Sequence, residues 1–268
     1  MKSVIKKGRY SLSILLGIWG IFSLSSCSTE TSISSDSGMG IIRNSTSIGG
    51  TTGVGGSFAR FTIVGDYLYV LHRNTLFTYL ISDPANPQFL GPVQIGSGNE
   101  TIHHNGNHLF LGADQGMRVY SIQDPTRPRF VGEYTHATAC DPVIVINNYA
   151  YVTLHSGTEC RGNINQMDVL DVSNVSQPRL LNTLPMKQPK GLGGNSEYLY
   201  VCDKDEVVIF SLLDPILPEK VGAIAIENPY DIIVLNDLLM VTSQEGIHQY
   251  TLENPASPLH LSHIRAHR

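Results

Sequence analysis

Two acidic side chains are the candidates for catalysis in this sequence. Glu100 and Asp141 occupy equivalent places in two sequence repeats described below, so we expect them on one rim of the fold. A pair of carboxyl groups can act as acid and base in glycosidic bond cleavage. No Walker loop, zinc-type cysteine spacing, G-x-S-x-G elbow or dinucleotide fingerprint accompanies them. The pair therefore supports only an alternative hypothesis, a glycan-active hydrolase or lyase.

Histidines offer a second kind of chemistry. His103 and His108 flank Asn105-Gly106 and would face each other across a two-residue hairpin, a spacing that suits two metal ligands. No third ligand is identifiable beside them, so we expect structural roles and no bound metal or other cofactor. The histidines near the end of the chain are expected to be solvated: His260, His263 and His267.

The cysteines indicate where the chain goes. A basic start and an apolar run from Leu12 to Leu24 precede Cys27, and small residues stand directly before that cysteine. This resembles the lipobox of bacterial lipoproteins, which implies a signal peptide over residues 1–26 and acylation of Cys27. The apolar run is too short to span a bilayer. Ser28 resembles an outer-membrane sorting signal, so we expect a lipid-anchored protein of the cell envelope, most consistent with the outer membrane.

Residues 27–57 are expected to form a flexible tether. Ser, Thr and Gly dominate this stretch, and it holds too few apolar residues to order itself. Its one apolar pair, Ile41-Ile42, is compatible with an added strand. Removal of the basic leader leaves 14 basic and 23 acidic residues, a net charge of −9. A protein with this net negative charge repels the phosphate backbone, so we expect no nucleic acid as a partner.

A repeat of about forty residues fills positions 58–268. An Asp/Asn-x-x-x-Pro turn recurs five times, ending at Pro87, Pro128, Pro178, Pro218 and Pro258. Before each turn comes a five-residue run of aromatic and β-branched residues, apolar on both faces, as a doubly buried strand should be. The runs are Asp66 to Val70, Asn107 to Leu111, Asn148 to Val152, Glu197 to Val201 and Asp237 to Val241.

Four short strands per repeat, without helical periodicity, are typical of a β-propeller blade. We therefore predict an all-β fold, a five-bladed β-propeller built from four-stranded repeats of about forty residues, in which ring closure buries the last edge. An open β-solenoid or a sandwich is the alternative. The runs Asp66 to Val70, Arg129 to Gly132 and Val207 to Pro215 resemble the LVIVD-repeat family of exported bacterial proteins, its Bacteroidetes lipoproteins most closely. That resemblance implies fold and compartment but no activity.

One rim of such a propeller collects the loops that enter the first strand of each blade and those that join the second strand to the third. Binding sites favour such loops, which vary on a rigid scaffold. The predicted binding face comprises Arg60, Glu100, Asp141, His155, Glu159, Arg161, Lys190, Tyr230 and Asp231. A solvated rim with no ligand is the alternative interpretation of these residues.

The third repeat carries an insertion of roughly ten residues, His155 to Gln166, which holds Cys160. Cys140 lies in a loop expected on the same rim, and an oxidising compartment favours a disulfide between them. Cys202 is then left as a buried thiol. The sequence thus predicts a non-catalytic binding module for an unidentified protein or glycan, held to the membrane by its lipid. A purely structural envelope component is a further possibility.

Overall fold

Five four-stranded antiparallel sheets make up the computed structural model, which describes residues 56–135, 142–156 and 164–266. The strands of each sheet pair in chain order, and we number the sheets as blades 1 to 5. Blade 1 holds β1 (Phe61–Val64), β2 (Tyr67–His72), β3 (Thr75–Leu80) and β4 (Gln88–Gln94); blade 2 holds β5 (Asn99–Asn105), β6 (His108–Ala113), β7 (Gly116–Ser121) and β8 (Arg129–Thr135).

The other three blades repeat this plan. Blade 3 holds β9 (Val143–Ile146), β10 (Tyr149–Leu154), β11 (Gln166–Asp171) and β12 (Arg179–Pro185). Blade 4 holds β13 (Pro189–Gly194), β14 (Tyr198–Asp203), β15 (Glu206–Ser211) and β16 (Glu219–Ala225). Blade 5 holds β17 (Pro229–Leu235), β18 (Leu238–Ser243), β19 (Gly246–Thr251) and β20 (Leu259–Arg265).

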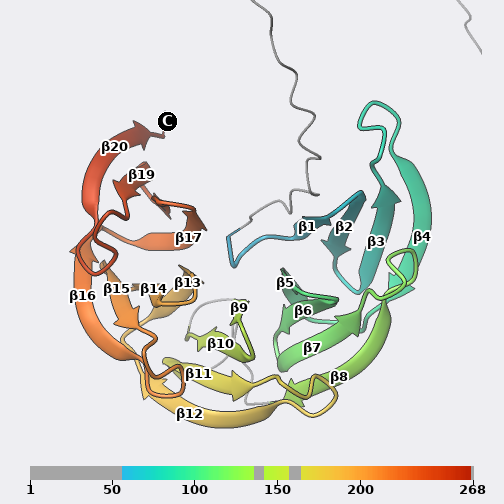
Figure 1. Ribbon diagram of the computed structural model, residues 1–268, viewed down its shortest axis with the longest axis horizontal. Helices are drawn as coiled ribbons and strands as arrows, with labels where there is room; N and C mark the ends of the chain where they lie inside the picture. Colours follow the sequence, from blue (N-terminus) through green and yellow to red (C-terminus); the bar gives the residue numbers. More distant parts are fainter. Residues whose placement is uncertain (1–55, 136–141, 157–163, 267–268) are drawn as a thin grey trace, which may run out of the picture. The chain divides into compact units, whose positions relative to one another are not determined.

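The blades stand side by side around an axis, with the first strand of each innermost and the fourth outermost (Figure 1). This confirms the predicted all-β, five-bladed propeller and excludes the sandwich. The described residues contain no helix, and so none long and apolar enough to cross a membrane. The leader, Cys27 and Ile41-Ile42 lie outside the described residues.

Left-handed backbone closes the first hairpin of four blades. Gly65, Gly106, Asn147 and Asn236 have φ between 52° and 58°. Such angles suit the tight turns that match strand twist, and Gly and Asn adopt them at least cost. In blade 2 the register pairs Asn105 with His108, and His103 with Phe110. The expectation that His103 faces His108 is therefore wrong, because the turn lies one residue further along than predicted.

The predicted Asx turns are present and also join the blades. Asp83 Oδ1 accepts a hydrogen bond from Ala85 N at 3.0 Å, and Asp214 does the same for Ile216 N at 2.9 Å. A tyrosine hydroxyl from the preceding blade donates to a carbonyl of such a turn in three cases. The pairs are Tyr69 with Pro125, Tyr151 with Pro215 and Tyr200 with Pro255, at 2.9 to 3.0 Å.

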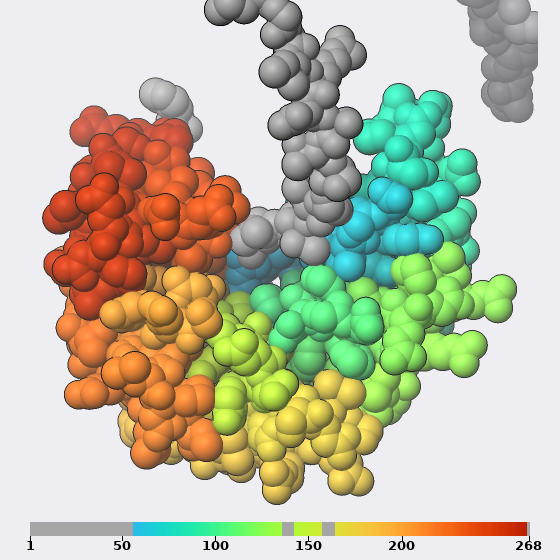
Figure 2. Space-filling view, viewed as in Figure 1, coloured from blue at the N-terminus to red at the C-terminus, as the bar shows by residue number. Residues whose placement is uncertain are grey.

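Buried apolar clusters join four pairs of neighbouring blades (Figure 2 shows the packed blades). Leu71 and Leu109 belong to the cluster between blades 1 and 2, and Val119 and Val152 to that between blades 2 and 3. The clusters between blades 3 and 4 and between blades 4 and 5 are built in the same way. Burial of this apolar surface is the main force that holds the propeller together.

The described strands of blade 5 and blade 1 stand apart in Figure 1, and no strand pairing joins these two sheets. Among the described residues no buried apolar cluster joins these two blades. Leu68 and Val70 on the open side of blade 1 are only partly buried, whereas Leu109 and Leu111, their equivalents in blade 2, are fully buried. Among the described residues, hydrogen bonds described below connect these two blades in place of an apolar cluster.

Candidate binding face

The two predicted kinds of loop do share one rim. Backbone hydrogen bonds link them within blade 2 (Asp114 N to Gly98 O, 2.9 Å), within blade 4 (Lys204 N to Gln188 O, 3.2 Å) and between blades 4 and 5 (Ile226 N to Asp205 O, 3.2 Å). Each bond joins the turn between a second and a third strand to the loop that enters a first strand. At these places the two kinds of loop therefore lie together on the ends of the β-sheets.

Three of the rim residues meet where blades 4 and 5 adjoin, and two of them, Lys190 and Tyr230, were predicted. The Lys190 ammonium lies 4.9 Å from the centroid of the Tyr230 ring, and it donates to Asn228 Oδ1. Asn228 Nδ2 donates in turn to the Tyr230 hydroxyl at 3.2 Å. Burial lowers the pKa of Lys190 below its ordinary value. We call Lys190, Asn228 and Tyr230 the rim cluster; its tyrosine is 40% exposed.

Asp231, also predicted on the binding face, binds the chain segment that enters blade 1. Its Oδ1 accepts from Ser57 N at 3.0 Å and from Ser57 Oγ at 2.9 Å, and its Oδ2 accepts from Phe58 N at 3.2 Å. Ser57 Oγ accepts in turn from Leu192 N of blade 4 at 2.8 Å. Ser57 is 2% exposed, so this polar network is shielded from water. It connects blades 4 and 5 to the start of blade 1.

The surroundings of Asp231 are tight and poorly solvated. Burial raises the pKa of its carboxyl, and hydrogen bonds from Ile232, Ser57 and Phe58 oppose that rise. A Cβ atom on Gly56 would lie 2.0 Å from Asp231 Oδ2, and one on Gly191 would lie 2.5 Å from Oδ1, so neither position has room for a side chain. Asp231 therefore serves the fold and has little freedom to meet a ligand.

Cys202 lies beside these groups at the end of β14. It is a free, fully buried thiol, as predicted. Burial raises the thiol pKa, the Asp231 charge adds to the rise and the Lys190 charge opposes it. The thiol therefore stays protonated at neutral pH, the unreactive form.

The other described residues of the predicted binding face belong to blades 1 to 3. Arg60 is exposed just before β1, Glu100 lies within β5 and His155 follows β10. Asp141, Glu159, Arg161 and both cysteines of the predicted disulfide, Cys140 and Cys160, lie outside the described residues. The carboxylate pair of the alternative hypothesis thus has one described member, Glu100.

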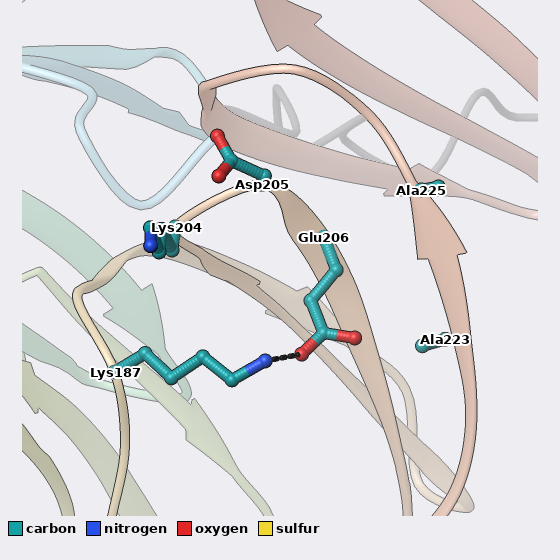
Figure 3. Close-up of a pocket in the computed structure, with 6 residues that line it drawn as sticks. All are labelled: Lys187, Lys204, Asp205, Glu206, Ala223 and Ala225. Atoms are coloured by element: carbon teal, nitrogen blue, oxygen red, sulfur yellow. Dashed lines mark hydrogen bonds and ion pairs between the residues drawn. The ribbon is translucent and has the colours of Figure 1, made fainter.

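A charged depression adjoins the rim in blade 4 (Figure 3). Lys187 Nζ contacts Glu206 at 2.7 Å, and Lys220 Nζ contacts the same carboxylate at 3.4 Å. The hydrogen bond from Lys187 lowers the pKa of Glu206, and Lys220 adds to the effect. The depression has a volume of about 450 Å³ and is lined by Lys187, Lys204, Asp205, Glu206, Ala223 and Ala225.

Sequence reasoning did not single out Lys187. The available signal was its position two residues before β13, the first strand of blade 4, where its backbone meets the acidic turn that starts at Asp203. Asp203 fixes the backbone there, since its Oδ1 accepts from Lys187 N at 3.0 Å and from Gln188 N at 2.6 Å.

The histidines have structural surroundings that differ in part from the expectation. His103 Nε2 lies 3.3 Å from Val145 O of blade 3, and burial lowers its pKa to about 4. His263 was expected to be solvated, but it is partly buried and its ring stacks on His248 at 4.1 Å. The cross-strand register creates this pair, which the spacing of histidines along the sequence does not reveal.

The fold and its rim define a β-propeller protein. The family model of the LVIVD repeat matches residues 55–94 and 138–184, and these ranges overlap the strands of blades 1 and 3. No curated protein matches the sequence.

Similar solved structures share the fold at low identity. A functionally unknown protein from Desulfotomaculum acetoxidans has a TM-score of 0.62 at 10% identity, covering 78% of this chain and 70% of that one. The designed protein Ika8 has a TM-score of 0.55 at 13% identity, covering 77% and 61%. The periplasmic gluconolactonase of Pseudomonas aeruginosa has a TM-score of 0.56 at 17% identity, covering 75% and 68%. This chain thus spans between 61% and 70% of the length of these three structures.

Proposed function

We propose that this propeller is a lipid-anchored module of the cell envelope that binds a protein or glycan without catalysis. The rim cluster carries the proposal. It places a cation, an amide and an exposed aromatic ring together on a rigid edge of two sheets. Aromatic and charged groups preorganised in this way are characteristic of recognition surfaces.

The charged depression of blade 4 extends this surface. Lys187 and Glu206 present charges of both signs beside the rim (Figure 3), so a partner with mixed polar groups, such as a peptide or a sugar, suits it better than a polyanion. The net negative charge of the chain agrees with this preference, because it repels nucleic acid.

The enzymatic alternative lacks an equivalent observation. A general acid needs a carboxyl of raised pKa that can reach its substrate. Asp231 has the raised pKa, but Ser57 and Phe58 of the same chain already occupy its oxygens. The likeness to a gluconolactonase concerns the fold at 17% identity and adds no catalytic group.

Crosslinking on intact cells tests the binding role. A photoreactive residue replaces Tyr230, the exposed aromatic member of the rim cluster. The control chain carries the same photoreactive residue in place of Leu213, which is 97% exposed and lies between β15 and β16, at the end of blade 4 opposite the rim. Both positions are therefore accessible, and only one of them belongs to the proposed binding face.

The expected result is a discrete crosslinked species from position 230 that position 213 does not give. The double variant K190A/N228A, which removes two members of the rim cluster, should weaken the yield, while R127A, an exposed cation in the turn between β7 and β8, should leave it unchanged. Equal crosslinking from positions 230 and 213 would contradict a specific binding face.

The anchor and the compartment need separate measurements. Metabolic labelling with palmitate should label the chain and fail to label C27S, because the thiol carries the lipid. Fractionation should place the labelled chain in the outer membrane, and protease treatment of intact cells distinguishes the outer surface from the periplasmic side. Label retained by C27S would contradict the proposed anchor.

A further inference from the structure

Two histidines and a glutamate converge at one end of blade 5. His248 of β19 and His263 of β20 are direct cross-strand partners, and Glu245 lies in the turn that precedes β19. One ligand atom from each of the three side chains lies within 4.8 Å of the others. The two imidazole rings are stacked, 4.1 Å apart and 11° from parallel. Both histidines are partly buried and Glu245 is exposed, so the group is open to solvent on one side.

The fold does not require histidines here, as the other blades show. The same cross-strand position holds Phe77 with Pro92, Arg118 with Glu133, Asp168 with Thr183 and Val208 with Ala223. Apolar, charged and polar pairs are therefore all compatible with the blade. The imidazole pair is specific to blade 5 and calls for an explanation beyond the repeat.

One nitrogen of each imidazole ring already lies within hydrogen-bond distance of a neighbouring oxygen atom. His248 Nε2 lies 3.1 Å from Ser243 Oγ, and His263 Nε2 lies 3.3 Å from the Glu245 carbonyl oxygen. In the tautomer with the proton on Nε2, each Nδ1 keeps its lone pair. Contacts of this kind orient the imidazoles of metal sites and leave the other nitrogen to the ion.

We propose that Glu245, His248 and His263 bind a divalent transition-metal ion, with zinc the best match. Two imidazoles and one carboxylate form a known three-ligand set for zinc, with the fourth position left for water or another ligand. Calcium and magnesium prefer oxygen ligands, so this set selects against them. Because the rings are nearly parallel, binding requires small rotations that direct both Nδ1 lone pairs at one ion while each Nε2 keeps its contact.

Titration calorimetry of the full chain with zinc chloride tests the site. We expect one ion per chain. The double variant H248V/H263A, which installs the pair that blade 4 carries at Val208 and Ala223, should lose this binding while it keeps the fold. The variant S243A should weaken binding by about 10- to 100-fold, since it removes a group that orients a ligand.

A matched control excludes binding by histidines in general. The variant H108Y removes a histidine from blade 2 and installs the tyrosine that blades 1, 3 and 4 carry at that position, so it should bind zinc as the unmodified chain does. Circular dichroism of each variant verifies the fold. No binding at one ion per chain, or equal binding by the unmodified chain and H248V/H263A, would overturn the proposal.

Discussion

The Ser57 hydroxyl donates a hydrogen bond to Asp231 Oδ1 at 2.9 Å, across 174 positions of the chain. It does so at the one junction between neighbouring blades where the described residues form no buried apolar cluster. The same hydroxyl accepts from Leu192 N, so a single side chain connects the entry to blade 1 with both blade 4 and blade 5. A directional polar contact here takes the place of the apolar packing that joins the other blades.

Removal of the Asp231 carboxylate should therefore destabilise the protein. D231A leaves the N–H groups of Ser57 and Phe58 and the Ser57 hydroxyl without this acceptor, at a cost of about 1–3 kcal/mol in the free energy of unfolding. The control D237A changes an exposed aspartate of the same blade and should stay within about 0.5 kcal/mol. Urea unfolding measures both, and equal stabilities would contradict the structural role of Asp231.

The tyrosine bonds between blades give a second prediction. Y151F and Y200F each remove a hydroxyl that donates to a turn of the next blade, and each should cost about 1 kcal/mol of unfolding free energy. Met240 holds the equivalent position in blade 5, where the arc ends. M240Y should consequently gain no such bond and no stability. A gain of about 1 kcal/mol or more in urea unfolding would indicate that a turn of blade 1 lies within its reach.

Acid should destabilise the protein through His103. Its pKa is about 4 in the folded chain, below the ordinary value of 6.5, because burial disfavours the charged form. The unfolded chain therefore takes up a proton first, and stability present above about pH 6.5 is lost as the pH falls towards 4, by roughly 1–3 kcal/mol.

The variant H103Q keeps a donor for the Val145 carbonyl but does not titrate. Its stability should fall less than that of the unmodified chain between about pH 6.5 and pH 4, as measured by urea unfolding at a series of pH values. The difference between the two curves isolates His103 from the other histidines. Parallel curves would show that His103 does not control the acid response.

The cysteines give a prediction about reactivity. Cys202 should resist alkylation in the folded protein and react once the chain is unfolded, because its thiol is buried and protonated. Peptide mapping of the non-reduced protein should recover Cys140 linked to Cys160. A peptide that links Cys202 to either of them would contradict both parts of this prediction.

Local sequence patterns predict many of the strands and turns of this fold. The runs that begin at Asp66 and Glu197 predict buried middle strands because both of their faces are apolar. The Asp-Pro motifs predict turns because Asp83 and its equivalents bond to backbone two residues on. The rim residues Lys190 and Tyr230 were also predictable, since position within a repeat determines the rim on which a loop emerges.

The sequence by itself determined the strands, the turns and the number of blades, because these depend on residues close together in the chain. Only the tertiary structure decided that Ser57 binds Asp231 between blades 1 and 5 and that His248 stacks on His263. These features depend on contacts between residues remote in sequence or on an exact strand register. A shift of one residue in that register would send such side chains to opposite faces of the sheet.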